Sequence, residues 1–156
     1  MPRFLAYVIA NLTGSCVSSQ CQAMEVSQAG DIANFMVPGK MLKGGVICTL
    51  HCRSMTYFCQ GVGGAMDLVS NPDKTKVIVT MEHCLKNGKP KILKECSLPL
   101  TGARAVSTIV TELAVFSVDR AAGVLELTDI AKGVTVDEVK SKTGCEFKIR
   151  EGLNTF

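Results

Sequence analysis

The sequence carries little net charge and has no basic cluster. Its formal net charge is +3, charged residues make up 20% of it, and no run of Lys or Arg is longer than two residues. A small and dispersed positive charge argues against nucleic-acid binding, which needs a basic patch. No apolar stretch approaches the roughly 20 residues that span a bilayer. With 156 residues, 47% of them apolar, the chain is predicted to form one globular domain with a real hydrophobic core.

The sequence also lacks the cysteine spacing of a disulfide framework or a zinc domain. Its eight cysteines are an even number, which alone would fit disulfide pairing. Cys48, His51 and Cys52, with Cys59 close by, look like half of a zinc site. No second Cys/His pair follows at a fitting distance, so no metal site is expected. Reduced thiols are the expected state, as in the cytosol or the mitochondrial matrix.

The most distinctive stretch is a glycine-rich turn at residues 61–70 that leads into an apolar segment. Glycines at 61, 63 and 64 leave backbone amides uncovered and permit backbone angles that other residues resist. A loop of this kind beside a buried strand presents N–H groups to the oxygen atoms of a ligand. A plain tight turn is the alternative interpretation, because glycine is the default turn residue.

Several segments after residue 75 have the patterns of strands. Residues 77–80 form a continuous β-branched run, which predicts a strand buried on both faces of a parallel or mixed sheet. Residues 109–118 are rich in Val, Ile, Leu and Phe and are predicted to supply a core strand. Residues 120–123 turn this strand back into residues 124–128, whose alternating apolar and polar side chains predict a hairpin.

One helix and a last strand are predicted near the C-terminus. Thr135 has the position of an N-cap, and Glu138 has the capping-box position. Gly144 is expected to stop this helix, and residues 145–149 are expected to form a final short strand. Strands and helices in mixed order predict an α/β fold.

Longer blocks of the sequence resemble one enzyme family. In the family's order they are Ala-Met-Glu-Val-Ser at 23–27, Gly-Asp-Ile-Ala-Asn-Phe-Met-Val-Pro-Gly-Lys at 30–40, Gly-Gly-Ala-Met-Asp-Leu-Val at 63–69, Val-Ile-Val-Thr-Met-Glu-His at 77–83, Lys-Ile-Leu at 91–93, Cys-Ser-Leu-Pro-Leu-Thr-Gly at 96–102 and Ile-Val-Thr-Glu-Leu-Ala-Val-Phe at 109–116. Together they resemble the C-terminal part of the B half of the 3-oxoacid CoA-transferases. The mitochondrial succinyl-CoA:3-ketoacid type is the most similar, because its tail also carries a segment like Lys-Thr-Gly-Cys at 142–145.

The resemblance implies an incomplete CoA-transferase-like α/β domain, with a mixed, mostly parallel sheet and flanking helices. It divides the chain into an unmatched N-terminal segment at 1–22, a partial B domain at 23–150 with an insert at 44–60, and a tail at 151–156. The segment 1–22 has the outline of a weak signal peptide and makes a poor transit peptide. Translated non-coding sequence or a misplaced start is the favoured interpretation of these residues.

The insert at 44–60 shows no clear helical or strand period. Its ends fit a short intron translated in frame, and an ordinary surface-loop insertion is the alternative. The insert is expected to be flexible and to disturb the glycine-rich turn that follows it.

The chemistry implied by the resemblance is transfer of CoA from succinyl-CoA to a 3-oxoacid such as acetoacetate, a step of ketone body catabolism. A glutamate attacks the thioester and becomes a glutamyl-CoA thioester, while backbone donors hold the developing oxyanion. The family's nucleophile lies in a Ser-Glu-Asn-Gly motif that is absent from this sequence, so no catalytic residue is predicted. The predicted oxyanion and substrate loop consists of Gly63, Gly64, Ala65, Met66 and Asp67. The N–H of Gly64 would face the reacting carbonyl, and Met66 and Asp67 would hold the loop.

Other polar residues are weaker candidates. Without the resemblance, Glu82 and His83 would be chosen as a general acid/base pair. The favoured interpretation is that Glu82 closes a strand and that His83 makes a structural hydrogen bond. Asn34 and Lys40 are polar positions in a matching block, and neither receives a role.

The resemblance also implies the partners of the intact enzyme. These are acyl-CoA and 3-oxoacid substrates and a second copy of the same chain, with coenzyme A as a substrate rather than a cofactor. Neither nucleic acid nor membrane is an expected partner, and the implied location is the mitochondrial matrix. An alternative is a non-catalytic truncated product that pairs with the full-length enzyme.

Overall fold

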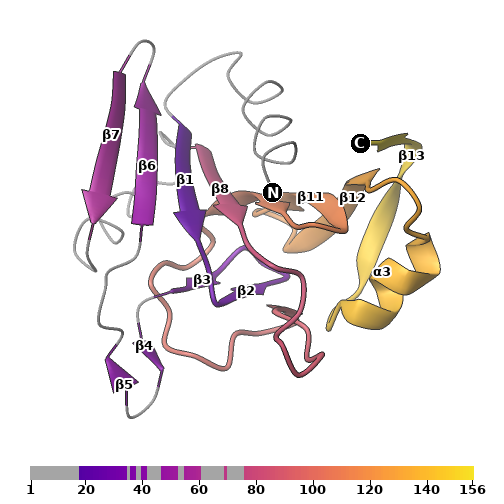
Figure 1. Ribbon diagram of the computed structural model, residues 1–156, viewed down its shortest axis with the longest axis horizontal. Helices are drawn as coiled ribbons and strands as arrows, with labels where there is room; N and C mark the ends of the chain where they lie inside the picture. The colour runs from indigo at the N-terminus through magenta and orange to yellow at the C-terminus, as the bar shows by residue number, and fades with distance from the viewer. Residues whose placement is uncertain are drawn as a thin grey trace.

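The computed structural model describes residues 18–34, 36–37, 40–41, 47–52, 55–60, 69 and 76–156. Its main element is an eight-stranded mixed sheet (Figure 1). The strands of this sheet, in chain order, are β1 (Ser18–Gln22), β6 (Ile47–Cys52), β7 (Met55–Gln60), β8 (Lys76–Thr80), β10 (Val106–Val110), β11 (Ala114–Asp119), β12 (Val124–Ile130) and β13 (Phe147–Thr155). Their order in space is β13-β12-β11-β10-β8-β1-β6-β7.

Two smaller sheets accompany the main one. The first has the order β3-β2-β9, and the second pairs β4 with β5. Their strands are β2 (Glu25–Ser27), β3 (Ile32–Ala33), β4 (Met36–Val37), β5 (Lys40–Met41) and β9 (Ile92–Leu93). Strand β2 pairs in parallel with β9 and antiparallel with β3, so it joins two of the blocks that carry the family resemblance.

Strand β8 lies at the centre of the main sheet and pairs in parallel with β1 on one side and β10 on the other. Its residues Val77, Ile78 and Val79 are buried, which confirms the strand predicted from the β-branched run. The pairs β1–β6, β6–β7, β10–β11 and β11–β12 are antiparallel, and β12–β13 is parallel. The sheet is therefore mixed, as expected, with parallel pairing at its centre and at the β13 edge.

The segment predicted as one strand at 109–118 is two strands. Strand β10 ends at Val110 and β11 begins at Ala114, and the two are antiparallel neighbours. Thr111 makes the turn: its N–H donates to the Ala114 carbonyl at 2.9 Å, and its Oγ1 accepts from the Ala114 N–H at 3.1 Å. The prediction is wrong here because an unbroken apolar composition hides a turn that a threonine side chain closes.

The hairpin predicted after this segment is confirmed by the antiparallel pairing of β11 with β12. At its turn, Asp119 Oδ1 accepts hydrogen bonds from the N–H groups of Ala121 and Ala122, both at 3.0 Å. Gly123 closes the turn with a φ of +66°, a conformation that favours glycine. The predicted alternation of apolar and polar side chains in β12 agrees with the full burial of Leu125 and Leu127.

The predicted helix is α3 (Val136–Lys142), and its start is confirmed because Thr135 Oγ1 accepts the Glu138 N–H at 3.3 Å. The second bond of a capping box is replaced by an ion pair, since Glu138 Oε1 lies 2.7 Å from Lys142 Nζ one turn later. The family resemblance implied more than one flanking helix. Within the described ranges α3 is the one complete helix, and it is not long enough to cross a membrane.

Gly144 has a different role from the predicted helix stop. The helix ends at Lys142 with Thr143 as its C-cap, whose N–H donates to the Lys140 carbonyl. Gly144 instead lies against β9: its N–H donates to the Ile92 carbonyl at 2.9 Å, and a Cβ would lie 2.9 Å from that oxygen. Glycine is therefore required for close approach of two backbones rather than for a left-handed cap.

The insert at 44–60, for which no strand period was found, contains the hairpin β6–β7. Strand β6 pairs with β1 from Ser18–His51 to Cys21–Cys48, and β7 pairs with β6 along its whole length. The described part of this segment therefore has regular backbone structure that its sequence period does not indicate, because it pairs with β1. Strand β1 itself includes residues that were assigned to the unmatched segment 1–22.

The C-terminal residues assigned to a tail continue β13 instead. Asn154 and Thr155 are in register with Asp129 and Ile130 of β12, and the Phe156 N–H donates to the Ile130 carbonyl at 3.1 Å. The last strand is thus longer than predicted, because a positive φ at Gly152 lets it bend and resume pairing.

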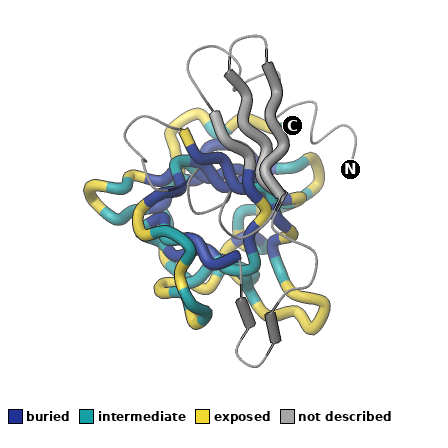
Figure 2. Tube along the Cα trace, turned by 90° about the vertical axis from the view of Figure 1, so that its left-hand side faces the viewer, coloured by how far each residue is buried: buried dark blue, intermediate teal, exposed yellow. Residues whose placement is uncertain are grey.

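The hydrophobic core lies between the main sheet, the small β3-β2-β9 sheet and α3. Figure 2 shows the buried residues in the interior, with exposed residues at the loops. Among the described side chains Phe116 is the largest that is fully buried, and its ring meets Phe147 edge-on at a centroid distance of 5.3 Å. Val139 of α3 and Ile92 of β9 are also fully buried in this cluster, so the helix and the small sheet pack on the same core.

Candidate functional site

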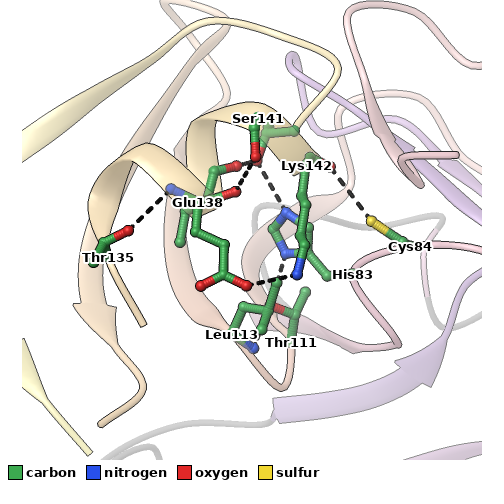
Figure 3. Close-up of polar contacts among 10 residues, drawn as sticks. His83, Cys84, Thr111, Leu113, Thr135, Glu138, Ser141 and Lys142 are labelled. Atoms are coloured by element: carbon green, nitrogen blue, oxygen red, sulfur yellow. Dashed lines mark hydrogen bonds and ion pairs between the residues drawn. The ribbon is translucent and has the colours of Figure 1, made fainter. Parts of the chain in front are cut away.

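Polar residues gather beyond the carboxyl ends of the parallel strands β8 and β10. In α/β sheets, ligands bind in this region. His83 follows β8 and is fully buried. Its Nδ1 lies 3.0 Å from Thr111 Oγ1, and its Nε2 lies 3.0 Å from Thr143 Oγ1 (Figure 3). His83 therefore ties the end of β8 to the β10–β11 turn and to the end of α3.

Both threonine hydroxyls have a backbone acceptor of their own. The Thr111 hydroxyl donates to the Ala114 carbonyl at 2.9 Å, and the Thr143 hydroxyl donates to the Val139 carbonyl at 2.7 Å. A neutral imidazole has one N–H, so one hydroxyl must turn toward the ring. The Thr111 hydroxyl turns toward the ring at the lower cost in free energy, because the Ala114 carbonyl that it leaves still accepts the Thr111 N–H. We therefore assign the neutral Nε2–H tautomer to His83.

Burial lowers the pKa of His83, an effect that the charge of Glu112 opposes and that of Lys142 reinforces. Glu112 also accepts the His83 backbone N–H at 2.9 Å. Glu82 points elsewhere: its side chain is 59% exposed and its carboxylate lies 3.7 Å from Lys91 Nζ. The structural hydrogen bond predicted for His83 is confirmed, and the two residues do not form an acid/base pair.

The predicted oxyanion and substrate loop, Gly63, Gly64, Ala65, Met66 and Asp67, lies outside the described residues. Val69, which follows it, is described and buried. Val69 packs on Gly102, where a Cβ would lie 2.7 Å from Val69 Cγ2. The chain on the C-terminal side of the loop is thus anchored against the segment that precedes β10.

Asn34, which received no role from the sequence, is buried at the junction of three segments. Its Nδ2 donates to the Gln22 carbonyl at 3.1 Å, at the end of β1. Its Oδ1 accepts from the Thr101 hydroxyl at 2.5 Å, and its backbone N–H donates to Thr101 Oγ1 at 3.1 Å. Thr101 and Gly102 adjoin, so Asn34 also supports the surface on which Val69 packs. Lys40 lies in β5.

Two carboxylates link the block at 96–102 and Arg104 to residues 25–31. The Glu25 carboxylate accepts from the Ser97 N–H and hydroxyl, both at 2.8 Å, and from the Leu98 N–H at 3.1 Å. The Asp31 carboxylate accepts from the Ser27 hydroxyl at 2.6 Å and from the Arg104 N–H at 2.9 Å. Sequence blocks more than 70 residues apart are therefore joined by charged hydrogen bonds, which no local pattern indicates.

A cleft of about 530 Å³ adjoins these contacts and is lined by Asp31, Lys94, Cys96 and Arg104 among others. Burial raises the pKa of the Cys96 thiol to about 12, with the charges of Glu25 and Asp31 adding to the shift. The thiol is therefore protonated at neutral pH and is not a nucleophile.

The side chains of Cys48, His51, Cys52 and Cys59, which resemble half of a zinc site in the sequence, lie outside those that the structure describes. Among the residues whose side chains are described, no group of three or more His, Cys, Asp or Glu residues could hold a metal ion.

The fold and these contacts define a mixed α/β domain with polar clusters beyond its central parallel strands. A protein-family model described as Coenzyme A transferase matches residues 19–142. The chain is 52% identical over 131 residues to the succinyl-CoA:3-ketoacid coenzyme A transferase 2A, mitochondrial, of Rattus norvegicus, covering 84% of this chain and 22% of the rat protein. It is 46% identical over 127 residues to one subunit of the Helicobacter pylori succinyl-CoA:3-ketoacid coenzyme A transferase, covering 81% of this chain and 51% of that subunit.

A solved structure has a similar fold. The acyl-CoA transferase of Escherichia coli O157:H7, crystallised as a thioester complex with CoA, matches with a TM-score of 0.61 at 20% identity, over 88% of this chain and 27% of that one. The chain belongs to the coenzyme A transferase family, and it is a homologue of the succinyl-CoA:3-ketoacid transferases. It spans about a fifth of the rat enzyme and about half of the Helicobacter subunit.

Proposed function

We propose that this chain is part of the B half of a 3-oxoacid CoA-transferase, whose intact form moves CoA from succinyl-CoA to a 3-oxoacid such as acetoacetate. The observation that carries the proposal is the high identity to the mitochondrial enzyme over most of this chain. The name of this relative supports a mitochondrial location, within which we propose the matrix. Acyl-CoA and 3-oxoacids are the proposed substrates of the intact enzyme.

The proposed reaction needs a carboxylate nucleophile and donors for an oxyanion. A glutamate attacks the thioester carbonyl and displaces CoA thiolate, which then opens the acyl anhydride to give glutamyl-CoA and the free acid. The second acid takes the CoA by the reverse steps. The loop at 63–67 is our candidate for the oxyanion donors, with the N–H of Gly64 aimed at the carbonyl oxygen.

The nucleophile must come from elsewhere, because the Ser-Glu-Asn-Gly motif is absent from this sequence. The described carboxylates near the candidate site already have partners. Glu25 holds the Ser97 segment, Asp31 holds Arg104, and Glu112 holds the His83 backbone. We therefore propose that the chain alone does not transfer CoA.

A second candidate function is a non-catalytic product that pairs with its full-length relative. The occupied carboxylates favour it, because they leave this chain without a described candidate nucleophile. Both candidates predict no CoA transfer from succinyl-CoA to acetoacetate by this chain alone. The assay separates them when the chain is added to a full-length enzyme.

The effect on the full-length enzyme distinguishes the two candidates further. A dose-dependent change in its turnover, together with co-elution on size exclusion, supports pairing. Turnover by the purified chain alone would contradict both.

A further inference from the structure

The turn between Leu85 and Lys89 carries an Asn-Gly pair at its tip. The Leu85 N–H donates to the Lys89 carbonyl at 2.8 Å and closes the turn, and Asn87 and Gly88 are both exposed. Gly88 has a φ of +81°, and a Cβ built on it would meet nothing within 4 Å. No side chain therefore covers the backbone nitrogen that follows Asn87.

This pair places a backbone nitrogen next to a side-chain amide that it can attack. Closure of a five-membered ring from the Asn87 amide carbon to the Gly88 nitrogen avoids the entropy cost of a bimolecular encounter. Glycine puts no side chain on the attacking residue. The Lys89 N–H donates to Asn87 Oδ1 at 3.2 Å, so a backbone donor already faces the oxygen on which negative charge develops during the attack.

One contact opposes the attack. The Gly88 N–H donates to the Leu85 carbonyl at 2.8 Å, and this hydrogen bond must break before the nitrogen reacts. It lies within one turn whose residues from Leu85 to Lys89 are all exposed. Solvent-exposed hydrogen bonds of this kind open at a low cost in free energy, so the bond slows the attack without preventing it.

We propose that Asn87 is a site of spontaneous covalent modification, at which the side-chain amide converts to aspartate and isoaspartate with water as the co-reactant. The Gly88 nitrogen gives up its proton to solvent and attacks Asn87 Cγ. The bond from Cγ to Nδ2 then breaks, so ammonia leaves and a succinimide ring remains. Water adds to one of the two ring carbonyls, and the ring nitrogen recovers a proton as its bond to that carbonyl breaks. Opening at Cγ gives aspartate, and opening at the backbone carbonyl carbon gives isoaspartate.

The conversion changes both the charge and the backbone of the turn. The formal net charge of +3 falls by one. Aspartate keeps an oxygen that accepts from the Lys89 N–H, now as a charge-assisted hydrogen bond. Isoaspartate routes the main chain through Cβ and adds one atom between Leu85 and Lys89, so the hydrogen bonds of the turn no longer fit. The site is separate from the proposed CoA chemistry and does not depend on it.

The other described asparagines lack this combination and serve as references within the same chain. Asn34 is buried, and its side chain is hydrogen-bonded on both its nitrogen and its oxygen. Asn154 is exposed, but it lies in strand β13 and is followed by Thr155. The branched Cβ of threonine crowds the nitrogen that would have to attack.

The test incubates the full 156-residue chain at mildly alkaline pH and stops samples by acidification. Each sample is digested with pepsin at low pH and mapped by peptide mass spectrometry, with electron-transfer fragmentation to distinguish isoaspartate from aspartate. We expect the Asn87 peptide to gain the mass of an amide-to-acid conversion before the Asn34 and Asn154 peptides do, with both products present. The intact chain should lose one positive charge on ion exchange over the same period.

Two glycine variants separate attack by the Gly88 nitrogen from a general loosening of the chain. Gly88→Ala places a methyl group on the attacking residue and should slow the conversion several-fold. Gly133→Ala is the matched control, because Gly133 has a φ of +84° and a built Cβ there also meets nothing within 4 Å. It carries the same backbone strain away from Asn87 and should convert at the parental rate.

The proposal is overturned if Asn87 of the folded parent chain keeps its amide over the time in which the chain in denaturant loses it. It is also overturned if Asn154 converts as fast as Asn87, or if Gly88→Ala keeps the parental rate. Mapping of the parent chain needs no substitution, so it decides the question even if a variant misfolds. Circular dichroism of each variant reports whether its fold is intact.

Discussion

Gly102 lies so close to Val69 that a Cβ placed on it would come within 2.7 Å of Val69 Cγ2. Gly102 does not have a positive φ, so the requirement for glycine is one of space. This contact joins Val69, near the end of the glycine-rich segment, to the segment that precedes β10. Thr101, the neighbour of Gly102, is hydrogen-bonded to Asn34.

We expect Gly102→Ala to destabilise the chain by about 1–3 kcal/mol, the usual effect of overpacking a buried site. The measurement is urea unfolding followed by circular dichroism. Val69→Ala creates room for the added methyl group, so the double variant should lose less than the sum of the two single effects. Additive losses would show that the two side chains do not interact.

Asn34→Ala should lower the free energy of unfolding by about 1–3 kcal/mol, because it leaves the Gln22 carbonyl and the Thr101 hydroxyl without their buried partner. The same unfolding measurement applies, with Asn87→Ala as control. Asn87 is exposed, and its side chain accepts one hydrogen bond within its own turn. Equal losses at both positions would contradict the role assigned to Asn34.

The stability of the chain should fall as the pH drops below the ordinary His pKa of about 6.5. Burial lowers the pKa of His83 in the folded state, so between the two pKa values the unfolded chain binds more protons. Stability is therefore fully present above the unfolded pKa and is lost as the pH falls toward the folded pKa. His83→Gln should flatten the pH dependence of the urea midpoint over this range. His51, the other histidine, provides the matched control in His51→Gln. An unchanged profile in His83→Gln would contradict the assignment of a buried neutral ring.

Two cysteines of the folded chain should react slowly with alkylating agents. Burial raises the pKa of Cys96 to about 12 and that of Cys145 to about 11. At pH 8 the thiolate fraction of Cys96 is then roughly a thousandfold lower than that of an unperturbed thiol. Iodoacetamide labelling with peptide mass spectrometry measures each rate, and the same peptides in denaturant serve as reference. Comparable rates in the folded and unfolded chain would contradict the burial of these thiols.

The sequence pattern correctly predicted those elements whose structure depends on a few neighbouring residues. The β-branched run at 77–80, the turn before Val124 and the cap at Thr135 are each specified by a few neighbouring residues, and each is confirmed. The break at Thr111 was missed because one hydroxyl closes that turn within an apolar stretch.

The remaining differences arise from contacts that are distant in the sequence. The β6–β7 hairpin is held by pairing with β1, and Asn34 acts through Thr101, 67 residues away. Gly144 is constrained by the Ile92 carbonyl rather than by its own helix. None of these partners can be identified from a window of neighbouring residues. The family resemblance located the blocks involved but not the hydrogen bonds that join them.

The central claim is that this chain is a CoA-transferase B segment that needs a nucleophile from elsewhere. The most direct test replaces the matching segment of the rat enzyme with residues 19–142 of this chain, leaving out residues 44–60, which have no counterpart in the resemblance. The chimera and the isolated chain are each incubated with acetoacetyl-CoA and weighed by intact-protein mass spectrometry. We predict a CoA-sized adduct on the chimera and none on the isolated chain. An adduct on any glutamate of the isolated chain, or a folded chimera that forms none, would contradict this account.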